Sequence, residues 1–118
     1  MSLPPRFLQS SGHALRGIAV AVRHERHVRI ELVAFTVVLF LGFLVRLQPW
    51  EWIAILLVSS FVLVVELVNS AVEYLLDLLK PRLHDYARDV KDVLAGAVFL
   101  AAFVAVVVGC IIFLPYLS

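Results

Sequence analysis

Long runs without a charged residue are the main feature of this chain. Residues 32–45 and 52–65 are uncharged, and no charge occurs from residue 93 to the end of the sequence. A helix needs about 20 mainly apolar residues to cross the hydrocarbon core of a bilayer. The third run meets this length alone, and the first two reach it when extended helically through neighbouring apolar residues. The pattern predicts three transmembrane helices, at about residues 28–47, 50–79 and 87–114.

The residues before the first run follow a helical period. Between residues 5 and 27, apolar positions fall on one face of a helix and the basic positions lie mostly on the other. An amphipathic helix that carries arginines and leads into a membrane span is typical of a segment lying in the membrane interface. The sequence therefore predicts an all-α membrane protein, a single domain over residues 1–118, with an interfacial helix at about residues 5–27.

Composition supports a membrane protein. The chain is 63% hydrophobic and 16% charged, whereas soluble domains average about 45–50% apolar and about 25% charged residues. The single cysteine, Cys110, excludes an internal disulfide framework and a cysteine-rich metal site. Basic and acidic residues nearly balance and no isolated basic patch occurs, which disfavours nucleic-acid binding.

Lysine and arginine are distributed unevenly around the predicted spans. They gather before the first span and between the second and third, whereas Arg46 alone lies in the first loop and none follows the third span. Cytoplasmic segments of membrane proteins carry this excess of basic residues. The bias predicts a cytoplasmic N-terminus and 80–91 loop, and places the 46–51 loop and the C-terminus outside.

One stripe of polar residues interrupts the second predicted span. Glu66, Asn69, Glu73 and Asp77 fall within an arc of roughly 80° on a helix, among apolar neighbours. A carboxylate at bilayer depth costs several kcal/mol unless it is paired, hydrated or near the interface. The stripe therefore marks either interhelical ion pairs or a functional site near the cytoplasmic boundary.

Two further polar groups lie on the same predicted side. Glu25, Arg29 and Glu31 precede or begin the first span, and the spacing of Glu25 and Arg29 also suits a simple surface pair. Lys91 and Asp92 stand directly before the third span. Carboxylates suit Mg²⁺, basic side chains suit phosphate oxygens, and phosphoryl transfer needs both together with a positioned base. The three groups are compatible with such a reaction on the cytoplasmic side.

The segments 66–77 (ELVNSAVEYLLD) and 81–98 (PRLHDYARDVKDVLAGAV) resemble the signature of the prokaryotic diacylglycerol kinase family. The likeness extends over nearly the whole chain from Arg6, and includes Gly12 and Gly17. The resemblance implies a lipid kinase that uses MgATP, with Mg²⁺ as its cofactor, in the bacterial cytoplasmic membrane. It also implies a homotrimer with composite active sites at the subunit interfaces.

The resemblance implies roles for individual positions. Glu66 matches the general base that takes the proton of the lipid hydroxyl, and Glu25 and Glu73 match the acids that hold Mg²⁺ with the ATP. Further residues match positions associated with the nucleotide: Arg6, His13, Glu25, Glu73, His84, Lys91 and Asp92. The remaining candidates match supporting or lipid-site positions: Asn69, Asp77, Arg29, Glu31 and Ala95.

Departures from the family pattern concern the substrate. His13 replaces a tyrosine of some members, and Ala95 replaces a serine of diacylglycerol-specific members. Segments 23–29 (RHERHVR) and 95–98 (AGAV) look more like the undecaprenol kinase branch, whereas Glu31 resembles the diacylglycerol branch. The balance slightly favours undecaprenol over diacylglycerol as the lipid alcohol.

Two classes without enzymatic activity compete with the kinase interpretation. A small multi-span carrier typically needs four spans and acids in the middle of the membrane. This sequence predicts three spans, with its acids toward the cytoplasmic end. A structural membrane subunit would not need the acidic stripe at all.

Overall fold

The computed structural model describes residues 5–79 and 84–118. Over these two ranges the chain forms four α-helices and no strand: α1 (Pro5–His24), α2 (Arg26–Val45), α3 (Pro49–Leu79) and α4 (His84–Leu117). The last three are long and apolar enough to cross a membrane. They are the three spans that the uncharged runs predict, and the chain is an all-helical integral membrane protein.

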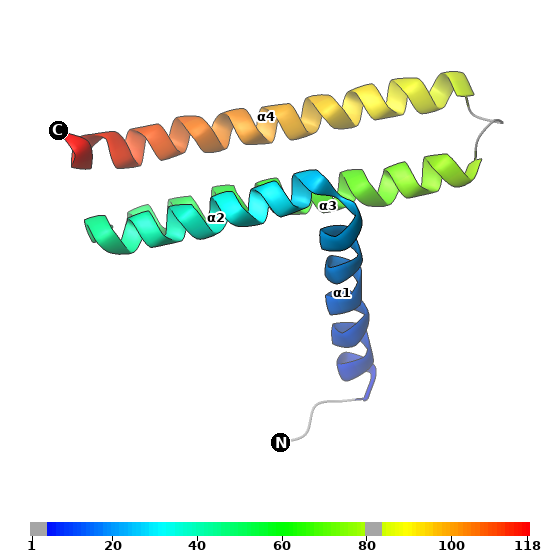
Figure 1. The fold of residues 1–118 in the computed structure, drawn as a ribbon, viewed down its shortest axis with the longest axis horizontal. Coiled ribbons are helices and arrows are strands. Elements are labelled where there is room, and N and C mark those ends of the chain that lie inside the picture. The colour runs from blue at the N-terminus through cyan, green and yellow to red at the C-terminus, as the bar shows by residue number, and fades with distance from the viewer. Residues whose placement is uncertain (1–4, 80–83) are drawn as a thin grey trace.

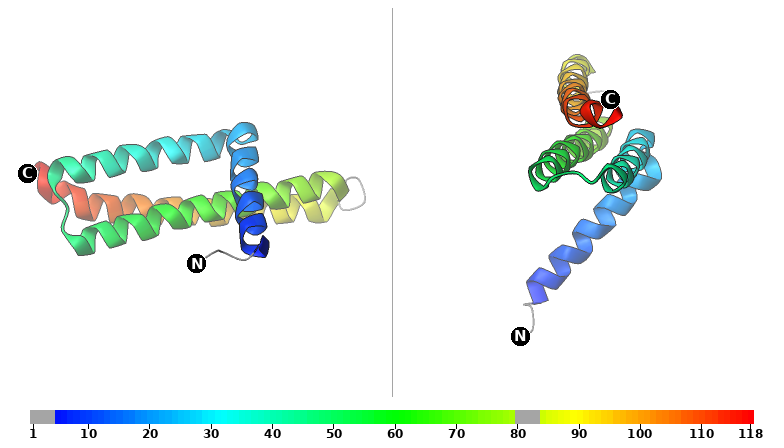
Figure 2. Two further views of the ribbon diagram at one scale, coloured as in Figure 1. Left: turned by 90° about the horizontal axis from the view of Figure 1, so that it is seen from below. Right: turned by 90° about the vertical axis from the view of Figure 1, so that its left-hand side faces the viewer.

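The three long helices run side by side, and α1 crosses them steeply (Figure 1). α4 packs along α3 more extensively than α2 does, and α1 contacts both α2 and α3. The α2–α3 turn and the C-terminal end of α4 lie at the same end of the long helices (Figure 1), which we call the loop end. The end at which α1 meets α2 is the corner end (Figure 2).

α2 and α3 differ in length. At 1.5 Å per residue, the 20 residues of α2 span about 30 Å, which matches the hydrocarbon core. The 31 residues of α3 span about 46 Å. As Figure 1 shows, α3 and α4 therefore continue beyond α1 at the corner end. This excess length places the second half of the acidic stripe beyond the start of α2.

The break between α1 and α2 lies at Glu25. Its backbone is extended, with φ −111° and ψ 113°, so α1 ends at His24 rather than at about residue 27 as the amphipathic pattern predicts. α2 accordingly begins at Arg26, two residues earlier than expected. The corner is therefore made by a single residue, which is itself one of the predicted metal ligands.

The loop end holds the packed core. Leu47, Ile55 and Ile112 are buried together there. Gly42 permits close packing, because a Cβ atom at this position would lie 2.6 Å from Cη2 of Trp52. α2 ends in a left-handed residue, Arg46, with φ 58°.

A buried carboxylate also joins two helices at the loop end. Glu51 is 6% exposed and accepts a hydrogen bond of 2.9 Å from the backbone N–H of Gln48. This bond satisfies one of the donors left open at the start of α3. The hydroxyl of Tyr116 donates a second hydrogen bond to the same carboxylate from the end of α4. Glu51 thus has polar partners within the described chain.

Candidate active site

The stripe on α3 passes from a buried to an exposed environment. Glu66 is only 4% exposed, Asn69 and Glu73 are half-buried, and Asp77 is exposed. The buried hydroxyl of Ser70 donates a hydrogen bond of 3.1 Å to the backbone oxygen of Glu66. The carboxylate of Glu66 itself accepts no hydrogen bond within the described residues. It is the most enclosed acid of the stripe.

The corner end brings further charges to Glu66. The charged groups that act on its carboxylate are His27, Glu31, Glu25 and Glu73. Glu25 comes from the α1–α2 junction and Glu31 from the second turn of α2, and both are half-buried. The electrostatic environment of Glu66 thus involves carboxylates from two stretches far apart in the sequence, residues 25–31 and residue 73.

α4 places a basic side chain beside Asp77, the last residue of the stripe. Nζ of Lys91 lies 3.5 Å from Oδ1 of Asp77, and both side chains are partly exposed. The pair links α4 to α3 at the point where the stripe reaches the surface. Asp92 and Ala95 lie on the same helix and are exposed.

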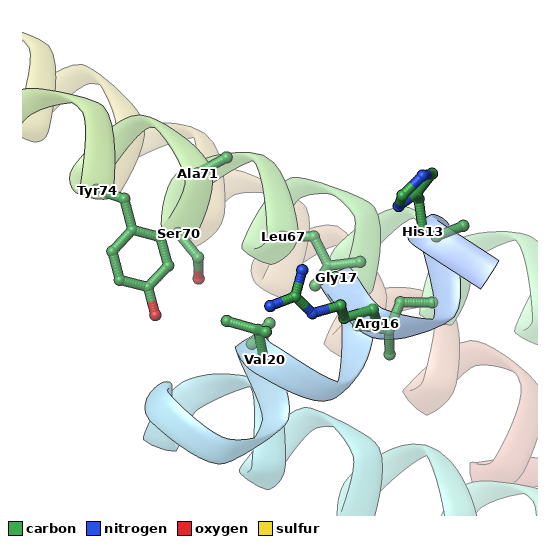
Figure 3. Close-up of a pocket in the computed structure, with 11 residues that line it drawn as sticks. His13, Arg16, Gly17, Val20, Leu67, Ser70, Ala71 and Tyr74 are labelled. Carbon is green, nitrogen blue, oxygen red and sulfur yellow. The ribbon is translucent and has the colours of Figure 1, made fainter. Parts of the chain in front are cut away.

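A groove separates α1 from α3. It encloses about 580 Å³ and is lined mainly by small and apolar residues, with His13, Arg16 and Tyr74 among them. In Figure 3 the side chains of Ser70 and Tyr74 extend from α3 toward α1, and Arg16 lies between the two helices. The groove therefore combines a largely apolar lining with one guanidinium group.

Two smaller hollows adjoin the acids. One encloses about 420 Å³ and is lined by Val20, His24, Glu25 and Tyr74. The other, of about 280 Å³, lies between α2, α3 and α4 and is apolar except for Glu31 and Ser59. Tyr74 borders both the α1–α3 groove and the hollow at Glu25. Each of the acids from the corner thus borders an open space.

The other predicted residues are distributed more widely. Arg6 is exposed in the first turn of α1, at the end that points away from the long helices (Figure 1). The single chain does not bring it to the stripe. Arg29 is exposed at the start of α2 and directs its guanidinium toward the last turn of α1. The side chain of His84 lies outside the described residues.

A metal site is not preformed in the described chain. No group of three His, Cys, Asp or Glu side chains in residues 5–79 and 84–118 is close enough to hold a metal ion. Mg²⁺ in nucleotide sites is commonly held by one or two carboxylates together with phosphate oxygens. Glu25 and Glu73 have the right chemistry, because carboxylate oxygens are ligands that Mg²⁺ prefers, and both contribute to the electrostatic environment of Glu66. The donor set therefore fits Mg²⁺ that arrives with its nucleotide.

Reasoning from the sequence missed three residues near the site. His27 contributes to the electrostatic environment of Glu66. Arg16 and Tyr74 line the α1–α3 groove. Tyr74 follows Glu73 directly, so its place beside the stripe was open to prediction. The positions of His27 and Arg16 depend on the turn at Glu25, for which the amphipathic pattern gives no signal.

Comparison with known proteins shows that this chain is similar to lipid kinases. The profile of the family described as prokaryotic diacylglycerol kinase matches residues 12–113. An undecaprenol kinase of Bacillus subtilis is 40% identical over 112 residues, which cover 95% of this chain and 91% of the relative. A diacylglycerol kinase of Escherichia coli is 32% identical over 109 residues, which cover 91% of this chain and 88% of the relative.

The fold and these matches define the class as a membrane-embedded lipid kinase. The chain belongs to the prokaryotic diacylglycerol kinase family, as the resemblance of its sequence implies. A carrier or a structural subunit without activity is thereby set aside.

Proposed function

We propose that this protein transfers the γ-phosphoryl group of ATP to the hydroxyl of a membrane lipid, with Glu66 as the general base. The observation that carries this proposal is the burial of Glu66 among Glu25, Glu31, Glu73 and His27 at the corner end. A carboxylate with no hydrogen-bond donor in the described chain is available to accept a proton from a substrate hydroxyl.

The reaction divides between the buried and exposed parts of the stripe. The carboxylate of Glu66 accepts the hydroxyl proton, the lipid oxygen bonds to the γ-phosphorus, and the bond from that phosphorus to ADP breaks. Glu25 and Glu73 would hold Mg²⁺, which would supply positive charge to neutralise the phosphates. Lys91 lies at the exposed side, where a cation favours phosphate oxygens. Asp92, His84, Arg6 and His13 are nucleotide contacts in this proposal.

Undecaprenol is the lipid alcohol that we propose in the first place, with diacylglycerol as the second candidate. The undecaprenol kinase relative shares 40% of aligned residues and the diacylglycerol kinase of Escherichia coli shares 32%. The supporting or lipid-site positions in this proposal are Asn69, Asp77, Arg29, Glu31 and Ala95. Glu31 suits this position because it borders the apolar hollow between the three spans.

The proposal also includes a membrane location and an assembly. The basic bias favours a bacterial cytoplasmic membrane protein with its corner end in the cytoplasm, where ATP is present. We also propose a homotrimer in which a neighbouring chain completes the site. Arg6 supports this assembly, because it lies in the first turn of α1, at the end of the helix that points away from the three long helices (Figure 1).

Phosphoryl transfer in mixed micelles tests the function. Purified protein receives ATP labelled at the γ-phosphate, with undecaprenol and diacylglycerol offered separately, and lipid-soluble label is counted. We expect labelled product with undecaprenol at the higher kcat/KM and no product after Mg²⁺ is removed by a chelator. Higher kcat/KM with diacylglycerol would reverse the substrate assignment. No labelled product from either lipid, with folded protein, would contradict the proposed function.

A further inference from the structure

The junction between α1 and α2 is a corner made at one residue. Glu25 is the only residue between the two helices, and its side chain does not cap α2. One backbone bond from its N–H to the oxygen of Ala21, at 2.8 Å, continues the pattern of α1. The last carbonyl groups of a helix lack partners in their own helix. These carbonyls are therefore open to a donor from another part of the chain.

Arg29 supplies that donor. Its Nη1 donates hydrogen bonds of 2.9 Å to the backbone oxygen of Val22 and of 3.0 Å to that of Arg23. Both carbonyls belong to the last turn of α1, where a positive charge also interacts favourably with the helix dipole. One side chain of α2 thus fastens the C-terminal end of α1 across the corner.

This contact differs from the one that sequence spacing favours. Glu25 and Arg29 are four residues apart, which suits an ion pair on a helix surface. Because the guanidinium is bonded to the carbonyls of α1 instead, it does not occupy the Glu25 carboxylate. Glu25 borders the hollow beside Tyr74 and acts electrostatically on Glu66. The direction of the Glu25 side chain therefore depends on a corner that Arg29 holds.

We propose that Arg29 is a positioning residue: by bonding the last carbonyls of α1 it fixes the corner and so places the Glu25 carboxylate toward the acids of α3. This inference rests on the proposed function, in which Glu25 and Glu73 hold the metal. Arg29 itself touches neither nucleotide nor lipid in this role.

Kinetic measurements separate positioning from simple stabilisation. In Arg29→Gln we expect the apparent KM for MgATP to rise by about 10- to 100-fold, the range for residues that orient a metal ligand. The KM for the lipid should stay unchanged, and additional Mg²⁺ should recover much of the rate. The KM of Arg29→Lys for MgATP should lie between those of the parent and of Arg29→Gln. An ammonium group also donates to carbonyls, but it lacks the planar geometry of the guanidinium group.

Arg26 offers a matched control one turn earlier. Its side chain is exposed and makes no hydrogen bond or ion pair within the described residues. Arg26→Gln removes the same charge from the same end of α2, and we expect wild-type kinetics for it. Equal KM values for MgATP in Arg29→Gln and Arg26→Gln would overturn the proposal. A fall in kcat and thermal stability without a KM difference, in both Arg29 variants, would also overturn it.

A distance measurement tests the corner without activity. With Cys110 replaced by serine, spin labels at Ser10 of α1 and Leu78 of α3, both exposed, report the angle of α1 by pulsed electron resonance. Excess unlabelled protein suppresses distances between copies. We expect one narrow distance in the parent and in Arg26→Gln, and a broadened or shifted one in Arg29→Gln.

The two measurements distinguish the possible failures. If the parent protein transfers no phosphate, the proposed function fails, while the spin-label distance still decides whether Arg29 holds the corner. If the parent is active and Arg29→Gln leaves both the distance and the KM for MgATP unchanged, only the positioning role is overturned.

Discussion

The loop end and the corner end each bury a glutamate of α3, and they treat it differently. Glu51 accepts hydrogen bonds from Gln48 and Tyr116 beside a packed cluster of apolar side chains. Glu66 lies among other acids, and its carboxylate accepts no hydrogen bond in the described chain. A buried carboxylate that is satisfied by its own chain stabilises the fold. Glu66 has no such partner in the described residues, so under the proposed function the loop end is structural and the corner end is catalytic.

Exchange of each buried glutamate for glutamine gives the largest expected contrast. Glu66→Gln is nearly isosteric but removes the proton acceptor, so we expect phosphoryl transfer to fall by about 10²- to 10⁴-fold. Glu51→Gln keeps a carbonyl oxygen for its donors, and we expect activity close to that of the wild type. Radiolabel transfer in mixed micelles measures both. Comparable losses in the two variants would remove the functional distinction between the two ends.

The acids around Glu66 should govern the use of magnesium. Glu25→Gln and Glu73→Gln each remove one carboxylate, and we expect the Mg²⁺ concentration for half-maximal rate to rise by about 10- to 100-fold. Asp89→Asn is the matched control, because Asp89 is an exposed acid of α4 outside the stripe. Titration of Mg²⁺ at fixed ATP checks this prediction. An unchanged Mg²⁺ dependence in both glutamate variants would leave the metal without its proposed ligands.

At the loop end, the close contact at Gly42 should limit stability rather than activity. A methyl group there meets the Trp52 indole, whereas nothing lies within 4 Å of the corresponding position at Gly109. Gly42→Ala should therefore be less stable than Gly109→Ala by about 1–3 kcal/mol, since overpacking costs this much. The alanine gains in helix propensity are common to both variants and cancel. Thermal unfolding in detergent compares them, and equal midpoints would show that Trp52 moves aside freely.

Loss of the Tyr116 hydroxyl should have the smallest effect. Tyr116→Phe leaves Glu51 with the Gln48 N–H alone, and we expect a loss of about 0.5–2 kcal/mol, as for other hydrogen bonds between helices. Tyr86→Phe serves as control, because Tyr86 is 72% exposed at the other end of α4. Unfolding midpoints again provide the measurement. A larger loss in Tyr86→Phe than in Tyr116→Phe would contradict the role given to the loop-end bond.

Periodicity and uncharged length were sufficient to predict the helices. The three membrane spans follow from runs without charge, because a charged side chain at bilayer depth is costly wherever it occurs. The stripe on α3 follows as well, because residues spaced by three and four share one helix face. Along this stripe the side chains become more exposed, from buried Glu66 to exposed Asp77. This order agrees with a helix whose last turns extend out of the membrane.

The sequence by itself therefore determined the class, the spans and the residues of the stripe, since each depends on local spacing. Tertiary structure alone decided the turn at Glu25, the bonding of Arg29 to the carbonyls of α1 and the approach of His27 to Glu66. It also joined Glu51 to Tyr116, 65 residues away. These contacts depend on where one helix stops and which helix packs beside it. A hydrophobic period indicates which face of a helix is apolar, but it does not indicate which other helix packs against that face.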